Sequence, residues 1–232
     1  AFYGCSGLTS ISLPSSLKAI ASSAFDNCSG LKGELNLGGC TSLASIGGSA
    51  FYGCSGLTSI SLPSSLKAIA SSAFDNCSGL KGELNLGGCT SLASIGGSAF
   101  YGCSGFTDLI LPEGLKSIGD TAFYGCSGLT GTLDLSNCTS LTSIGRNAFN
   151  GCSGLTSITL PSSLTSIGSQ AFRNCTSLTT MRVEATTPPT LSNTNAISTA
   201  TTRIEVPMAS VDAYKAATNW SNFADIIVGY TE

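Results

Sequence analysis

The strongest constraint on the fold is a 49-residue block that occurs twice in succession without a change. Residues 1–49 and 50–98 have the same sequence, and residues 99–147 are a third, diverged copy. Self-similarity at a fixed period is the signature of a solenoid, in which each unit packs only against its neighbours. Each block divides into a 23-residue and a 26-residue unit, and both begin with Ala-Phe. We therefore expect a one-dimensional array of coils.

The short unit follows the pattern A-F-x-x-C-x-x-L-x-x-I-x-L-P-x-x-L-x-x-I. In its first copy, Ile11 and Leu13 alternate with serines, which predicts a strand with one buried face. Pro14 is expected to end this strand because it has no N–H for a ladder. Leu17 and Ile20 suit a short strand or helical turn on the opposite wall. The long unit has three extra residues, which we expect to bulge outward because its inward apolar set is unchanged.

Counting the Ala-Phe starts predicts a solenoid of eight coils over residues 1–191, alternating 23 and 26 residues. Residues 192–232 are expected to form a small α+β C-terminal cap of strand, helix and strand. A polar loop is expected at its start, over 192–202. Strands are expected at 203–206 and 226–228, and a helix from Val211 to about Thr218 with Ser210 as its N-cap. Trp220, the single tryptophan, is expected to help bury the open end of the array. No polar capping unit stands at Ala1, so we expect the natural protein to continue upstream.

The short-unit pattern closely resembles the repeat of BspA-like leucine-rich-repeat surface proteins. The tail resembles the C-terminal cap of that family in I-x-V-P (204–207), S-V-x-A-Y-K-x-A (210–217) and W-S-x-F (220–223). The resemblance implies a leucine-rich-repeat solenoid, a β-rich, right-handed superhelix of the α/β type. It also implies an extracellular or bacterial cell-surface location and a role in adhesion or recognition. Extracellular-matrix proteins or other bacterial surface proteins are the implied partners, and the family offers no catalytic residue.

The eleven cysteines fall into two registers, and each stands three residues before a leucine of the apolar pattern. In a solenoid this spacing predicts ladders of buried thiols that act as small hydrophobic side chains. Stacked Cβ vectors run parallel, which is poor disulfide geometry, and zinc sites use C-x-x-C clusters that the chain lacks. Replacing one buried thiol by a hydroxyl, as in Cys103→Ser, is expected to cost about 1–3 kcal/mol because the hydroxyl would be unpaired. The main structural ladder consists of Cys5, Cys28, Cys54, Cys77, Cys103, Cys126, Cys152 and Cys175, and the second register of Cys40, Cys89 and Cys138.

Catalysis is not expected. The chain has no histidine, so the Ser-His and Cys-His pairs that activate nucleophiles are unavailable. Glu34, Glu83 and Asp134 are expected at equivalent outward strand positions, two coils or roughly 10 Å apart. A glycosidase pair needs two carboxyl groups in different surroundings, whereas Glu34 and Glu83 lie in identical sequence. No sequence motif indicates a cofactor or a metal.

Composition argues against nucleic-acid and membrane binding. The net charge is −3, and the ten Lys and Arg residues are scattered along the chain rather than forming the basic stripe of a nucleic-acid reader. No apolar run reaches the roughly 18–20 residues of a membrane helix. Membrane insertion of this segment is therefore not expected.

The remaining candidate for function is the outward face of the strands, which in solenoids is the default binding surface. This face is expected to be rich in Ser and Thr, slightly acidic and nearly free of aromatic residues. We expect a non-enzymatic module that binds a protein ligand there; a structural spacer and a glycan-binding module are the alternatives. The candidate contact residues are Glu34, Asn36, Glu83, Asn85, Asp108, Ile110, Asp134 and Arg182.

Overall fold

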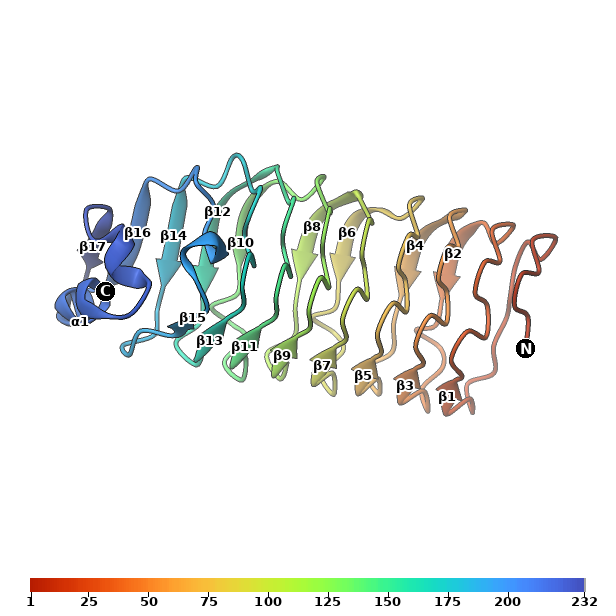
Figure 1. Cartoon of the computed structure of the whole chain (residues 1–232). Coiled ribbons are helices and arrows are strands. Elements are labelled where there is room, and N and C mark those ends of the chain that lie inside the picture. The colour runs from red at the N-terminus through yellow and green to blue at the C-terminus, as the bar shows by residue number, and fades with distance from the viewer. Residues whose placement is uncertain (232) are drawn as a thin grey trace.

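The computed structural model describes residues 1–231, and it shows coils stacked side by side along one axis (Figure 1). The second to eighth coils each contribute a strand of four to six residues to one wall and a two-residue strand to a second wall. Pairing between coils is parallel throughout. A third wall consists of turns that carry the Ala-Phe pairs. The fold is the leucine-rich-repeat solenoid that the repeats predict.

The two-residue strands form one continuous eight-stranded sheet. In each coil the Ile or Leu of this strand points inward and is buried, and the residue before it is more exposed. The strands are β1 (Ala19–Ile20), β3 (Ser45–Ile46), β5 (Ala68–Ile69), β7 (Ser94–Ile95), β9 (Ser117–Ile118), β11 (Ser143–Ile144), β13 (Ser166–Ile167) and β15 (Thr190–Leu191).

The longer strands form the opposite wall, which is divided into two pairs and one five-stranded sheet. The pairs are β2 (Gly33–Asn36) with β4 (Leu57–Ser61), and β6 (Lys81–Asn85) with β8 (Gly105–Ile110). The sheet contains β10 (Gly131–Asp134), β12 (Leu155–Leu160), β14 (Thr180–Val183), β16 (Arg203–Pro207) and β17 (Ile227–Tyr230).

A ladder of stacked phenylalanine rings runs along the turn wall. Successive rings lie 5.2–5.6 Å apart between centroids with interplanar angles of 4–10°. All are buried except Phe2, which is 47% exposed because the first coil has a neighbour on one side only. The rings are Phe2, Phe25, Phe51, Phe74, Phe100, Phe123, Phe149 and Phe172. Phe106, which replaces a leucine of the apolar pattern, is buried and meets Phe100 edge-on at 6.0 Å.

Two details of the coils differ from the sequence prediction. Ile11 and Leu13 are half-buried but form no strand, since the first coil can pair only with the coil after it. Lys32 of that second coil donates its N–H to the Thr9 carbonyl of the first coil at 3.1 Å. The three extra residues of the long unit do not all bulge outward. Gly38 and Gly39 are exposed in a turn, but Cys40 is buried.

A left-handed glycine begins each long-unit strand. Gly33 has a φ of +76°, and the register with β4 shifts immediately after it. Gly82 and Gly131 repeat this feature with φ of +78° and +71°. Glycine adopts this conformation without the steric cost that a Cβ would impose, so the insertion is absorbed without displacing the inward leucines.

Residues 192–202 were expected to be a polar loop, but most of this segment forms the turn wall of a ninth coil. The Ala196 carbonyl accepts a hydrogen bond from Phe172 N–H at 2.9 Å, as the Ala of each Ala-Phe pair does for the coil before it. Ala196, Ile197 and Ser198 are buried, and a short 3₁₀ helix, η1 (Thr194–Ala196), lies in this wall. Strand pairing continues on both sides of residue 191, since β15 pairs with β13 and β16 pairs with β14. The boundary between solenoid and cap at residue 191 therefore stays a prediction from the sequence.

The cap contains η2 (Met208–Ser210), α1 (Val211–Ala216) and η3 (Trp220–Phe223), followed by β17. The predicted strands and helix are present, although α1 is shorter than expected and the Ser210 side chain makes no capping hydrogen bond. Trp220 is fully buried and donates its Nε1–H to the Pro189 carbonyl at 2.7 Å. Tyr214 donates its hydroxyl to the Ala185 carbonyl at 2.8 Å and meets Trp220 edge-on. These aromatic side chains close the end of the solenoid.

The phenylalanine ladder predicts a position-dependent loss of stability. Phe74→Ala removes a fully buried ring with a stacked neighbour on each side, so the free energy of unfolding should fall by about 3–5 kcal/mol. Phe2→Ala is the matched control, because the same residue there is half-exposed with a neighbour on one side. It should cost less than half as much in urea unfolding. Equal losses for the two variants would contradict the ladder as a source of stability.

Candidate functional site

The cysteine ladder is a structural feature of the core. Ten of the eleven thiols are buried, whereas Cys5, expected to be one of the ladder, is exposed in the first coil. From the second coil onward, each thiol of the main register donates to the phenylalanine carbonyl of the preceding coil, with Sγ–O distances of 2.9–3.3 Å. Burial raises the pKa of the Cys54, Cys126 and Cys175 thiols to about 12. Such thiols are poor nucleophiles because the thiolate is the reactive form.

The reason given above for the cost of Cys103→Ser is therefore wrong. The Cys103 thiol lies 3.3 Å from the Phe74 carbonyl, so a serine hydroxyl would have an acceptor. The expected loss falls to about 1 kcal/mol, from poorer packing and the desolvation of the hydroxyl. Urea unfolding of Cys103→Ser measures this loss, and a loss of about 3 kcal/mol, the upper end of the range for an unpaired hydroxyl, would contradict the pairing.

Thiol labelling should separate Cys5 from the other cysteines. In the folded protein at pH 8, a small maleimide should modify one thiol quickly and the remaining ten only at the rate of unfolding, since these ten thiols are buried and out of its reach. In urea all eleven should react. The Cys5→Ser variant should lose the fast phase, and rapid modification of several thiols in that variant would contradict the buried ladder.

The structure places the candidate contact residues of the strand wall on its outward face, and seven of the eight are exposed. One equivalence was wrong: Asp134 pairs in register with Thr159 just as Asn36 pairs with Ser61, so it matches Asn36 and Asn85 rather than Glu34 and Glu83. The position of Glu34 is taken by Thr132 in β10. No triplet of carboxylates two coils apart exists at this position.

Several of these candidates form hydrogen bonds with the backbone at or just after their own strands. The side-chain oxygens of Asn36, Asn85 and Asp134 accept from the backbone N–H two residues later, at 2.9–3.1 Å. Asp108 accepts from the Leu109 N–H at 2.8 Å. Short polar side chains commonly stabilise turns in this way. Ile110 is the apolar exception, at 39% exposed.

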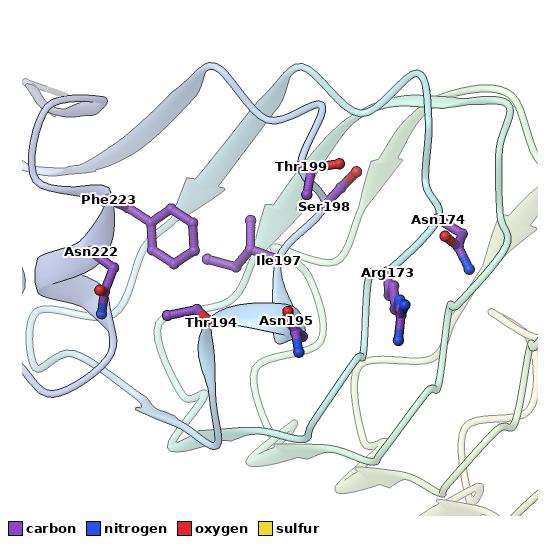
Figure 2. A pocket seen from close by; sticks show the side chains of 9 residues that line it. All are labelled: Arg173, Asn174, Thr194, Asn195, Ile197, Ser198, Thr199, Asn222 and Phe223. Carbon is purple, nitrogen blue, oxygen red and sulfur yellow. The ribbon is translucent and has the colours of Figure 1, made fainter.

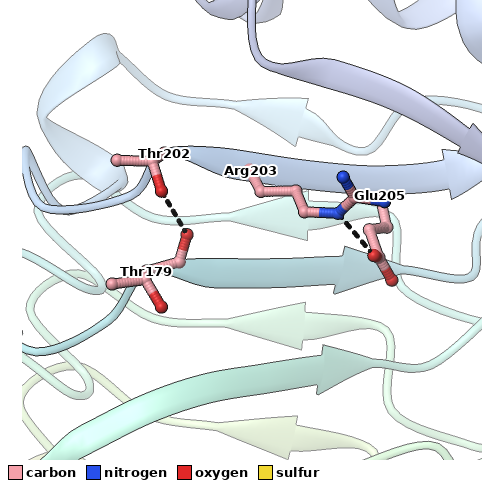
Figure 3. Close-up of polar contacts among 4 residues, drawn as sticks. All are labelled: Thr179, Thr202, Arg203 and Glu205. Carbon is pink, nitrogen blue, oxygen red and sulfur yellow. Dashed lines mark hydrogen bonds and ion pairs between the residues drawn. The ribbon is translucent and has the colours of Figure 1, made fainter.

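The C-terminal end of the strand wall has a different chemistry, on β14, β16 and β17. The Arg182 guanidinium lies over the Tyr230 ring, 3.7 Å from its centroid, and Arg182 Nε is 3.9 Å from a Glu184 carboxylate oxygen. On β16, Arg203 Nε donates to Glu205 Oε1 at 2.7 Å, close to the contact between Thr202 and the Thr179 carbonyl (Figure 3). Sequence reasoning found Arg182 but missed Arg203 and Tyr230.

The sequence carries no signal that Tyr230 meets Arg182, because the two residues are far apart in the chain. Tyr230 ends β17, which pairs with β16 at Pro207. Sequence reasoning also missed two tyrosines on the turn wall. Tyr101 and Tyr124 occupy the same position in successive coils and stack with centroids 4.8 Å apart; both are half-buried.

A polar hollow of about 490 Å³ lies on the turn wall, between the ninth coil and the cap. Figure 2 shows side chains from the eighth coil, from the segment around η1 and from η3 arranged about it. It is lined by Arg173, Asn174, Thr194, Asn195, Ile197, Ser198, Thr199, Asn222 and Phe223. None of these residues was a candidate from sequence, since they belong to segments outside the repeat pattern or at its last copy.

The arrangement of potential metal ligands and the character of the helices bear on metal binding and membrane insertion. Within residues 1–231, His, Cys, Asp and Glu side chains do not gather in groups of three that could hold a metal ion. Over the same residues, no helix combines the length and apolar character needed to cross a membrane.

The parallel ladders, the inward leucines and the short repeat define a leucine-rich-repeat solenoid. The family model for the BspA type leucine rich repeat region matches six copies, over residues 1–130 and 83–193. The chain belongs to this family.

The chain is similar to several solved structures. A leucine-rich-repeat protein of T. pallidum is 29% identical, with a TM-score of 0.61, covering 73% of this chain and 77% of its own. A leucine-rich cell surface protein from Faecalibacterium prausnitzii is 21% identical, with a TM-score of 0.49, covering 97% and 80% respectively. A leucine-rich-repeat protein from Bacteroides ovatus is 21% identical, with a TM-score of 0.44, covering 100% and 80%. No curated protein matches the sequence.

Proposed function

We propose that this chain is a non-enzymatic recognition module that binds a protein ligand through the C-terminal end of its strand wall. The observation that carries the proposal is the stacking of Arg182 on Tyr230. Arginine and tyrosine are enriched among the residues that dominate binding energy at protein interfaces. The rest of the outward face consists mostly of Ser, Thr, Asn and scattered acids.

The pair is well suited to form an anchor for a partner. The Arg182 side chain is 36% exposed, although its Nε is buried and has no hydrogen-bond partner within residues 1–231. A partner that covers the exposed part of the side chain would remove water from the stack, which strengthens a cation–π contact. Glu184 and Glu205 beside it add acceptors of their own. A partner with both a carboxylate and a basic group would match this surface.

The proposal includes an extracellular or bacterial cell-surface location, with a matrix protein or another bacterial surface protein as the partner. Membership of the BspA-type family supports this expectation. The buried thiols are compatible with it, because burial protects them from the oxidation that extracellular thiols otherwise meet.

The test is a binding survey of matrix proteins and bacterial surface proteins by surface plasmon resonance, followed by variants. For a ligand found in this way, Arg182→Ala and Tyr230→Ala should each weaken binding by about tenfold or more, as expected for hot-spot residues. Ser59→Ala, on the same face near the other end, is the control and should change affinity by less than about twofold.

Two results would contradict the proposal. Failure to bind any protein on the survey would favour the structural spacer. Equal effects of Arg182→Ala and Ser59→Ala would place the contact elsewhere on the solenoid. Circular dichroism and urea unfolding of each variant establish that the fold is retained.

A further inference from the structure

The hollow on the turn wall exists because one hydrogen bond of the coil-to-coil ladder is missing. In each coil, the residue two positions after the phenylalanine of the Ala-Phe pair has a left-handed backbone conformation. In the seven preceding pairs of coils, the N–H of this residue donates to a carbonyl of the next coil at 2.7–2.9 Å. Asn27, for example, donates to Tyr52 and Gly151 donates to Arg173. At the eighth position Asn174 has the same left-handed φ of 60°. Its N–H nevertheless makes no hydrogen bond within residues 1–231.

The missing bond follows from the sequence of the ninth coil. Ile197 stands where the earlier coils have phenylalanine, and Ser198 turns its carbonyl to Thr201 N–H at 3.1 Å instead of back to Asn174. Beyond this coil the cap supplies η3 rather than another turn of the ladder. The two segments therefore separate and leave the hollow between them (Figure 2).

The lining offers many neutral hydrogen-bonding groups and one positive charge. Arg173, Thr194, Asn195 and Thr199 are exposed, and within residues 1–231 their side chains form no hydrogen bond or ion pair. The free Asn174 N–H adds a backbone donor. No carboxylate is among the lining residues. Amide and hydroxyl groups can both donate and accept, as recognition of sugar hydroxyls requires.

Phe223 supplies an apolar surface at one end of the hollow, beside Ile197, while Arg173 lies at the other (Figure 2). Phe223 is half-buried and packs against the core, so its position is fixed. The apolar face of a pyranose ring suits such an aromatic surface. The guanidinium presents a planar fork of donors that matches a carboxylate in a bidentate contact.

We propose that this hollow binds an acidic saccharide of two or three sugar units. One ring packs on Phe223, and the carboxylate of another unit pairs with Arg173. Asn195, Thr194 and Thr199 bind the hydroxyls between them. The volume of about 490 Å³ falls within the range of roughly 300–1,000 Å³ typical of small-ligand sites. The site lies on a different wall from Arg182 and Tyr230, so it is independent of the proposed protein-binding surface.

The test is a titration of the whole chain with a uronic-acid-containing disaccharide and, separately, with its carboxyl-reduced, neutral counterpart. Binding is measured by isothermal calorimetry and saturation-transfer NMR. The acidic disaccharide should bind saturably. Arg173→Ala should weaken it by about tenfold, the size expected of a charge-assisted pair, and should change binding of the neutral counterpart by less than about twofold. Asn195→Ala, a change at an exposed residue, should weaken both.

Controls separate the site from general effects of charge and from the strand wall. Arg146→Ala removes the same charge from an earlier coil and should leave saccharide binding unchanged, as should Arg182→Ala. The proposal is overturned if neither disaccharide binds saturably, if Arg173→Ala and Arg146→Ala weaken binding equally, or if an acidic peptide of similar length binds as tightly as the acidic disaccharide.

Discussion

The structure depends on the parallel hydrogen bonding of each coil to the next along its walls. The Ala-Phe turns donate to one another coil by coil at about 2.8 Å, and the two-residue strands repeat a pairing of residues with identical roles. Once this register is fixed, every inward position of one coil lies against the same position of its neighbour. Phenylalanine therefore stacks on phenylalanine, and each cysteine of the main register from the second coil onward meets a phenylalanine carbonyl. The packing of the core therefore follows from the hydrogen-bond register, because that register alone places like residues of neighbouring coils against each other.

This dependence explains which parts of the fold were predictable from the sequence. Inward residues have a period and an apolar character, so the coils, both walls and the burial of ten cysteines could be predicted. What failed were features set by backbone conformation rather than by side-chain pattern. The Asn174 N–H, unpaired within residues 1–231, and the left-handed Gly33 leave almost no signal in hydrophobic periodicity. The ninth coil was missed because Ile197 replaces the phenylalanine by which the coils were counted.

The candidate sites were harder to predict for a related reason. Outward positions are not constrained by the ladder, so a polar side chain there can either contact a ligand or form a hydrogen bond with the backbone next to its own strand. Asn36 and Asn85 had been candidates for contact, but their side chains cap the turn two residues later. Tyr230 was missed because its partner Arg182 is 48 positions away in the sequence and two strands away in the sheet. Only the three-dimensional arrangement brings the two side chains together.

The exact repetition of the first block also limits where specific recognition can occur. A contact residue within residues 1–49 has a copy in residues 50–98, so a ligand that binds one copy finds a closely similar sequence two coils away. Two such sites roughly double the chance of occupancy, and they increase affinity further only when one ligand spans both. They cannot fix the position of a ligand along the solenoid. The Arg182–Tyr230 stack and the hollow around Arg173 each occur once, where the repeats end, and a ligand that contacts either has one position on the molecule.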